Sequence, residues 1–283
     1  MQFGMGLPNQ VRNVNPTVIP AWAARAEEAG FSMLGTVGRF AYPGVVDTVA
    51  LAAAAAVTSR IELISNVLLA PTWPAPLLAK ELAGINGISG DRLTIGLGLG
   101  AREDDFVLDA YPNKGLGKRF DADLEIYRDI WSGAKVGGGV NPAVPEGTKQ
   151  VRMLFGGSAK QTYARMAKWG VGYVGGSIPA SMVAPSFDAA RAAWTEAGRD
   201  GAPRLIAIAY YSVAHEDGRA NIYDYYSFLG DEIATMIANN GAVGVAEIDA
   251  TIKSFEDIGA DTLLFNPMTD DPDEIERLAE LLP

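Results

Sequence analysis

The chain has 283 residues, of which 48% are hydrophobic, and it carries a formal net charge of −11 at pH 7. This length and composition suit one sizeable core, whereas the lack of cysteine and the single histidine exclude disulfides, thiolate chemistry and a His-rich metal site. The acidic balance argues against nucleic acid or an anionic membrane as a partner. No apolar run reaches the roughly 18 residues of a membrane span, so we expect a soluble cytoplasmic protein without metal.

Apolar strand candidates alternate with helical patterns along the whole chain. Strands are expected at Gln2–Leu7, Met33–Val37, Ile61–Leu68, Leu93–Leu99, Met153–Phe155, Gly172–Val174, Leu205–Val213 and Thr262–Phe265. Helices are expected at Val18–Ala29, Val45–Val57, Pro76–Ile88, Phe120–Trp131, Lys160–Lys168, about Pro185–Ala197, Tyr223–Asn239, Val245–Ile258 and Pro272–Leu282. A Gly/Pro-rich linker occupies about 135–150. Eight strands, each followed by a helix, predict an α/β fold, a single (β/α)8 TIM barrel domain over 1–283, in preference to an open doubly wound sheet.

The segment 59–100 forms a strand, a helix and a second strand, which implies a parallel strand pair. Ser65 and Asn66 lie near the end of the first strand, and Gly96, Gly98 and Gly100 lie at the end of the second. Ligands bind at the carboxyl ends of the strands in parallel α/β folds, and small residues there let a flat ligand approach the backbone. We therefore expect the active site at this end of the barrel.

Four segments together resemble the luciferase-like monooxygenase superfamily, the flavin- or deazaflavin-dependent oxidoreductases that are built on this barrel. They read TSRIELISNVLLAPTWPAPLLAKELAGINGISGDRLTIGLGLG, AARAEEAGF, RFDADLEIYRDIW and MLFGGSAKQTYARMAKWGVGYV. The resemblance runs from the N-terminus to about Gly176. It implies a flavin-type cofactor bound at the strand ends.

In that family a non-prolyl cis peptide at the end of the third strand forms a bulge behind the central flavin ring. The resemblance places this bond between Asn66 and Val67. The residues alone would predict an ordinary trans strand. Gly98 and Gly100 would let the flavin edge lie against the strand end. Arg102 would reach the phosphate or the carbonyl edge of the ring, or would instead pair with the acidic run that follows it.

Two Gly-Gly-Ser turns follow neighbouring strands. They consist of Gly156, Gly157 and Ser158, and of Gly175, Gly176 and Ser177. Free N–H groups at a helix N-terminus and a hydroxyl suit a phosphate, and relatives put the cofactor phosphate in the first region. Plain strand-to-helix turns are the alternative for each.

The sequence departs from the family at the end of the second strand. Many relatives have an Asp-His pair there, whose imidazole serves proton transfer, and the aligned residues here are Gly38 and Arg39. A guanidinium cannot act as a base at neutral pH, although it can hold an anion or polarise a carbonyl. Arg39 is therefore one catalytic candidate. His215, beyond the seventh strand, is the other, unless it is simply an exposed loop residue.

The resemblance thus predicts a flavin-dependent oxidoreductase. Its preferred form is a monooxygenase that uses reduced FMN and oxygen on a small hydrophobic substrate, with FMN delivered by a separate flavin reductase. The alternative is hydride transfer with F420, which has a polyglutamate tail and suits an acidic chain less well. A sugar-phosphate lyase or isomerase and a non-catalytic flavin-binding barrel also stay open. The alanine-rich helix around 51–57 and the helix Leu77–Ile85 predict a homodimer, although packing against the barrel explains the same pattern.

Overall fold

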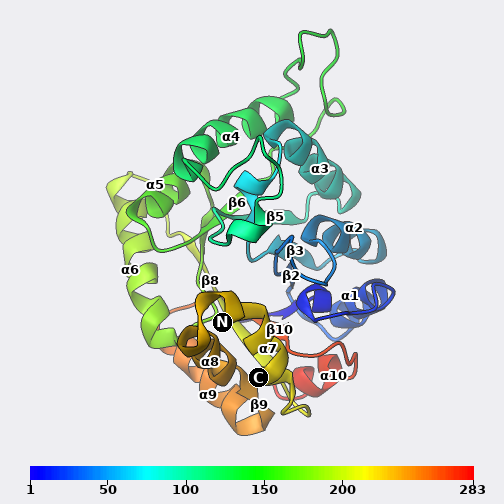
Figure 1. Cartoon of the computed structure of the whole chain (residues 1–283), viewed down its shortest axis with the longest axis vertical. Helices are drawn as coiled ribbons and strands as arrows, with labels where there is room; N and C mark the ends of the chain where they lie inside the picture. The colour runs from blue at the N-terminus through cyan, green and yellow to red at the C-terminus, as the bar shows by residue number, and fades with distance from the viewer.

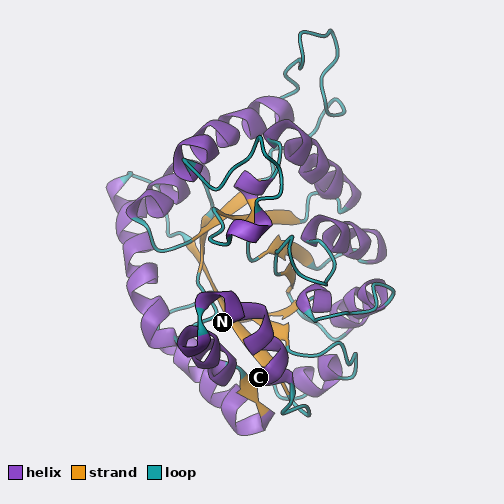
Figure 2. Cartoon of the chain, in the orientation of Figure 1, coloured by secondary structure: helices purple, strands orange, loops and turns teal.

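The computed structural model describes all residues, 1–283. The strands lie inside a ring of helices (Figures 1 and 2). Eight strands pair in parallel in the order β1, β2, β3, β5, β6, β7, β8, β10, and β10 pairs back with β1, so that the sheet closes. The predicted (β/α)8 barrel of one domain is therefore confirmed.

The strands are β1 Gln2–Gly6, β2 Met33–Thr36, β3 Glu62–Ser65, β4 Leu68–Leu69, β5 Leu93–Gly98, β6 Arg152–Gly156, β7 Gly172–Val174, β8 Arg204–Ser212, β9 Ala242–Val243 and β10 Thr262–Pro267. The helices are α1 Val18–Glu28, α2 Asp47–Val57, α3 Ala75–Ile88, α4 Leu116–Trp131, α5 Lys160–Trp169, α6 Ala180–Glu196, α7 Gly218–Tyr226, α8 Asp231–Asn240, α9 Gly244–Asp257 and α10 Glu274–Ala279. Short 3-10 segments are η1 Pro8–Gln10, η2 Ala70–Thr72, η3 Glu103–Asp105 and η4 Ser227–Leu229.

Two hydrophobic clusters fill the two sides of the barrel wall. A small cluster of seven buried residues includes Met33, Ile64, Leu154 and Leu264 and fills the barrel interior. A larger cluster of 56 buried residues lies between the strands and the helices. This division follows from the alternation of side chains along each strand, which sends neighbours to opposite faces.

The third predicted strand, Ile61–Leu68, is divided in the structure into β3 and β4. The Ser65 side chain explains the interruption, because its hydroxyl donates to the carbonyl of Gly96 at 2.6 Å and accepts from the N–H of Leu68 at 3.3 Å. The Ser65 side chain thus replaces the backbone hydrogen bonds between β3 and β5 at the point where the chain turns. The strand prediction was therefore wrong at its end.

Two helix predictions also differ from the structure. The helix predicted at Tyr223–Asn239 is two helices, α7 and α8, because Gly230 between them has φ +90°, which no helix contains. The helix predicted from about Pro185 begins earlier, and Pro185 lies inside α6. Pro185 is exposed, whereas Val183 and Phe187 are buried, so packing of the inner face carries the helix through it.

The linker predicted at about 135–150 is a loop that extends away from the barrel (Figure 1). Its two arms meet at an isolated antiparallel bridge between Lys135 and Pro142. None of the helices has both the length and the apolar character that a membrane crossing needs.

The outer faces of α2 and α3 expose several large apolar side chains. Val49, Val57 and Ile88 are 56%, 45% and 62% exposed. The homodimer expected at these helices stays a prediction.

Candidate functional site

Glycines surround the side chain of Val67 at the carboxyl end of the barrel. The peptide bond between Asn66 and Val67 is cis, as the family resemblance implied. A methyl group added at Gly98 would lie 2.6 Å from Val67 Cγ2, and one added at Gly156 would lie 3.0 Å from Val67 Cγ1. The structure thus brings four of the predicted cofactor residues together. Gly98 and Gly156 therefore make room for the Val67 side chain, in addition to any ligand that binds there.

The amide of Asn66 is buried in the barrel mouth and lacks a full set of partners. Its Oδ1 accepts a long hydrogen bond from Asn266 Nδ2 at 3.4 Å, whereas Asn66 Nδ2 and Asn266 Oδ1 have no partner. Gln10 on η1 donates from Nε2 to the carbonyl of Pro267, the residue after Asn266, and its Oε1 is also buried without a partner. Buried polar atoms are seldom left unpaired, so this group has the chemistry to bind the polar edge of a ligand.

The two Gly-Gly-Ser turns differ in their solvent exposure and in whether the serine hydroxyl already has a hydrogen-bond partner. Gly157 and Ser158 are exposed at the N-terminus of the ten-residue helix α5, and Gly157 has φ +116°. Ser177 is instead 7% exposed, and its hydroxyl lies 2.8 Å from the hydroxyl of Tyr226. The first turn is therefore open to an anion, whereas the hydroxyl of the second is already engaged.

Gly175, Gly176 and Gly100 have separate surroundings. Gly175 is buried, and a methyl group there would lie 2.8 Å from Val183 Cγ1 on α6, so the residue allows close helix packing. Gly176 is exposed beside Ser177. Gly100 has φ +78° and turns the chain after β5.

Helix α7 and segment η4 lie over the carboxyl end of the barrel and cover part of its mouth (Figure 1). The hydroxyl of Tyr226 lies 3.0 Å from that of Tyr210 on β8 and 2.8 Å from that of Ser177. Tyr225 packs edge to face on Tyr42 with ring centroids 4.9 Å apart. The sequence pattern predicts only a helix here and does not reveal a covering segment, although the segment carries four aromatic residues, Tyr223, Tyr225, Tyr226 and Phe228.

Arg39 points into this aromatic cover. Its Nη1 donates to the carbonyl of Tyr225 at 2.5 Å and its Nη2 to that of Ala41 at 2.9 Å, and the guanidinium stacks on the ring of Tyr42 at 4.7 Å. Burial lowers the pKa of Arg39. The guanidinium thus holds the cover in place, and only its Nε remains buried without a partner.

Arg102 lies under the same cover. Its guanidinium pairs with Asp104, and it stacks on the ring of Phe228 at 4.2 Å. The hydrogen bond to Asp104 raises the pKa of Arg102. The pairing with the acidic run that the sequence left open is therefore present.

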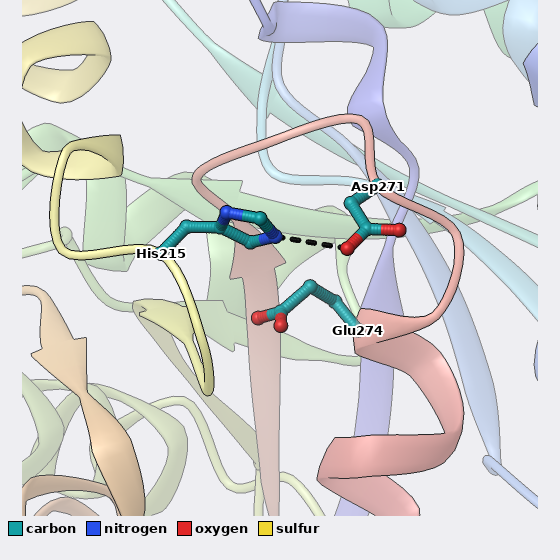
Figure 3. A group of neighbouring side chains, drawn as sticks. All are labelled: His215, Asp271 and Glu274. Atoms are coloured by element: carbon teal, nitrogen blue, oxygen red, sulfur yellow. Dashed lines mark hydrogen bonds and ion pairs between the residues drawn. The ribbon is translucent and has the colours of Figure 1, made fainter.

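His215 lies on the loop between β8 and α7, beside Asp271 and Glu274 (Figure 3). Its Nε2 is 2.8 Å from Asp271 Oδ2, and the side chain is 37% exposed. Burial acts against ionisation of Asp271, but hydrogen bonds from His215 and Arg277 outweigh it and lower the pKa of that carboxyl to about 2. His215 therefore fixes the loop between β8 and α7 to the segment before α10.

His215, Asp271 and Glu274 lie close enough for one metal ion, with ligand atoms within 4.8 Å of one another. The carboxylate of Glu274 is already saturated by Ser212, by two backbone N–H groups and by the guanidinium of Arg277. A cation placed there would meet the positive charge of Arg277, so these residues do not suit a metal.

A cavity of about 610 Å³ opens between the loop after β2, the start of α3 and the segment after η3. We call it the α2–α3 pocket. Its apolar lining consists mainly of Leu69, Trp73, Pro74, Leu77, Val107 and Leu108. Asp47, the first residue of α2, also lines it and is only 4% exposed. The helix pattern at Val45–Val57 does not single out Asp47, because only the fold brings α2 against the loop after β2.

The environment of Asp47 is unfavourable to a negative charge. Burial raises its pKa to about 6, and hydrogen bonds from the backbone of Asp47 and Thr48 oppose this only in part. Its Oδ2 has no partner. A methyl group at Gly38 would overlap this oxygen, so glycine at 38 leaves room for the carboxyl.

We predict that Asp47→Asn raises the free energy of unfolding by about 2–3 kcal/mol at pH 8. At that pH Asp47 is ionised, and its pKa in the folded chain lies about two units above that of a free aspartate, so its ionisation costs the fold about that energy. A carboxyl whose pKa is higher in the folded than in the unfolded state stabilises the fold below pH about 4. That contribution is lost as the pH rises through about 6. The measurement is urea unfolding from pH 4 to 8. The exposed substitution Asp109→Asn is the control, and a Asp47→Asn variant no more stable than the wild type at pH 8 would contradict the argument.

Comparison with known proteins agrees with this architecture. The sequence profile of the family described as luciferase-like monooxygenase matches residues 1–271. Uncharacterized protein Rv0940c of Mycobacterium tuberculosis (strain ATCC 25618 / H37Rv) is 29% identical over 133 residues, which cover 39% of this chain and 46% of that protein. The chain thus spans about half the length of the curated relatives it matches.

Solved structures resemble the chain over nearly its whole length. An F420-dependent secondary alcohol dehydrogenase in complex with an F420-acetone adduct has a TM-score of 0.78 at 14% identity, and the match covers 100% of this chain and 99% of that one. A type II Baeyer-Villiger monooxygenase, the oxygenating constituent of 3,6-diketocamphane monooxygenase from the CAM plasmid of Pseudomonas putida, in complex with FMN, has a TM-score of 0.75 at 16% identity. That match covers 99% of this chain and 96% of that one. At such identities the likeness establishes the fold. Because the family profile spans nearly the whole chain and the barrel closes as in these structures, the chain belongs to the luciferase-like monooxygenase family, whose members are flavin- or F420-dependent oxidoreductases and monooxygenases.

Proposed function

We propose that the chain is a flavin-dependent monooxygenase that binds reduced FMN at the carboxyl end of the barrel and acts on a small hydrophobic substrate. The observation that best supports this proposal is the solvent-exposed Gly-Gly-Ser turn at the N-terminus of α5. Ser158 is exposed there, no side chain caps the helix, and the first N–H groups of a helix have no intrahelical partner. A phosphate monoester suits such a terminus, and Lys160 in the first turn adds a positive charge.

The residues at the mouth fit the ring as well as the phosphate. The unpaired Asn66 Nδ2 is a hydrogen-bond donor for a ring carbonyl, and the unpaired Asn266 Oδ1 is an acceptor for a ring N–H. Val67 would support the ring face, and Tyr226 with its neighbours on α7 would limit the entry of water. Bound reduced FMN would supply the electrons for the reaction with oxygen.

FMN is preferred over F420 because F420 carries a polyglutamate tail and the chain has a net charge of −11. The structural neighbours include a protein that binds each cofactor. Delivery of reduced FMN by a separate flavin reductase stays a prediction.

The test is a fluorescence titration of the full chain with FMN and with F420. Ser158→Ala should weaken FMN binding about tenfold, since a hydrogen bond to a charged group contributes about 1.5 kcal/mol. Ser177→Ala is the matched control, because that hydroxyl is bonded to Tyr226, and it should change the affinity less than twofold.

Each result has a definite reading. A clear preference for F420 would replace monooxygenation by hydride transfer. Binding of neither cofactor would contradict the proposal and favour a sugar-phosphate lyase or isomerase. Binding of FMN without formation of any oxygenated product by the reduced complex, over a panel of apolar substrates in the presence of oxygen, would favour a non-catalytic flavin-binding barrel.

A further inference from the structure

The α2–α3 pocket combines apolar walls with one buried carboxyl group. Trp73 and Leu77 give it a surface suited to a hydrocarbon, and its volume of about 610 Å³ is that of a small-molecule site. Asp47 and Asp105 are both buried in the pocket lining, and each has a carboxyl oxygen without a hydrogen-bond partner. Asp105 Oδ2 lies 3.8 Å from the guanidinium of Arg102, whereas Asp47 forms no ion pair. A carboxyl in this position is not needed for packing, since an apolar side chain would fill the space at lower cost.

The loop after β2 is built around this carboxyl. Gly38 has no side chain, and a methyl group there would overlap Asp47 Oδ2 while lying 3.1 Å from the carbonyl oxygen of Val67. The carboxyl oxygen and this carbonyl therefore border the same small space. The pocket wall thus adjoins the bulge at Asn66 and Val67, where the cofactor is proposed to bind.

We propose that the carboxyl of Asp47 is the polar anchor of the α2–α3 pocket and holds the oxygen of an apolar alcohol or ketone. The proposal rests on the proposed function, for which it names the substrate class. A neutral carboxyl donates a hydrogen bond to a ketone oxygen, whereas a carboxylate accepts one from a hydroxyl group. An anionic ligand is disfavoured next to Asp47 above pH about 6, because the ionised carboxylate would repel it.

The charged and titratable groups that surround Asp47 come from α3, the loop after β2, η3 and α7, and we assign the change of charge in the pocket to Asp47. Glu81 on α3 raises the pKa of Asp47, and Lys80 lies on the same helix at the pocket rim. Arg39 is held by carbonyl groups, and Asp105 on η3 accepts from the backbone N–H groups of Phe40 and Ala41. Tyr225 on α7 is kept neutral, because burial raises its pKa well above the ordinary value.

The experiment measures the binding of 2-nonanone and 2-nonanol to the full chain by calorimetry at pH 5 and pH 8, without cofactor. The ketone should bind about fivefold to tenfold more weakly at pH 8 than at pH 5, because a hydrogen bond of this kind contributes about 1 kcal/mol or slightly more. The alcohol should change in the opposite direction. The pH range is set by the pKa of Asp47, about 6.

Two variants separate the anchor from a general effect of pH. Asp47→Asn keeps a donor and an acceptor but cannot titrate, so both affinities should become independent of pH. Asp123→Asn is the matched control, since Asp123 on α4 is 5% exposed, has an unpartnered carboxyl oxygen and has its pKa raised by burial to about 6, yet lies outside the pocket lining. It should keep the opposite pH dependences.

Gly38→Ala provides a second route to the same result. Its methyl group would displace the Asp47 carboxyl, and the pH dependence should be lost while thermal unfolding shows that the chain still folds. An Asp47→Asn variant that keeps the wild-type pH dependence would overturn the proposal, as would a wild-type chain that binds neither probe. Because no cofactor is present, either failure is distinct from a failure to bind FMN.

Discussion

Gly96→Ala should lower the free energy of unfolding by about 3 kcal/mol or more. A methyl group at this position of β5 would overlap the carbonyl oxygen of Ser65 and lie 3.2 Å from Val67 Cγ1. The oxygen belongs to the backbone and cannot turn aside as the end of a flexible side chain would, so the strand pair must separate. Overpacking of a core typically costs about 1–3 kcal/mol, and a collision with backbone lies at the upper end of that range.

The measurement is urea unfolding, followed by the FMN titration on any variant that folds. Gly84→Ala is the control, because Gly84 lies within α3 and a methyl group there has no neighbour within 4 Å. That substitution should raise the free energy of unfolding by about 1 kcal/mol through helix propensity. Equal stabilities for the two variants would mean that β5 does not approach Ser65 as closely as described.

Glu274→Ala should lower the free energy of unfolding by about 3–5 kcal/mol. The side chain is 1% exposed, and its carboxylate accepts from the hydroxyl of Ser212 at 2.9 Å and from the N–H groups of Val213 and Ala214. It also pairs with Arg277 at 3.0 Å. Removal of one buried charge leaves several donors without an acceptor and one cation without its partner.

Glu276→Ala is the control for this prediction. Glu276 lies on the same helix and pairs with Arg25, but its side chain is 47% exposed. Exposed ion pairs contribute about 1 kcal/mol at most, so the effect should be several times smaller. Thermal unfolding and urea unfolding would both report the difference, and similar losses for the two variants would contradict the structural role of Glu274.

Glu274 matters for the site because it fixes the loop after β8, from which α7 begins. That helix carries Tyr225 and Tyr226 over the barrel mouth, where they meet Arg39 and Ser177. A Glu274→Gln chain that still folds should therefore bind FMN more weakly, although it contacts no ligand.

The sequence by itself determined the class of fold. The alternation of apolar strands with helical patterns predicts eight parallel strands, and all eight are present, because periodicity reflects which side of each element is buried. Where these predictions fail, tertiary contacts override local signals. The buried face of α6 carries the helix through Pro185, and Ser65 ends β3 with its own hydroxyl.

The candidate site was determined by sequence only in part. The resemblance to the family gave the bond between Asn66 and Val67 and the turn at Ser158, since these residues lie in contiguous segments. Only the tertiary structure decided that Ser177 is bonded to Tyr226, that Arg39 is held by the aromatic cover and that Asp47 lines a pocket. In each case the contacting residues are distant along the chain. The pKa of a carboxyl such as Asp47 depends on its burial among such residues, and the local sequence does not specify that burial.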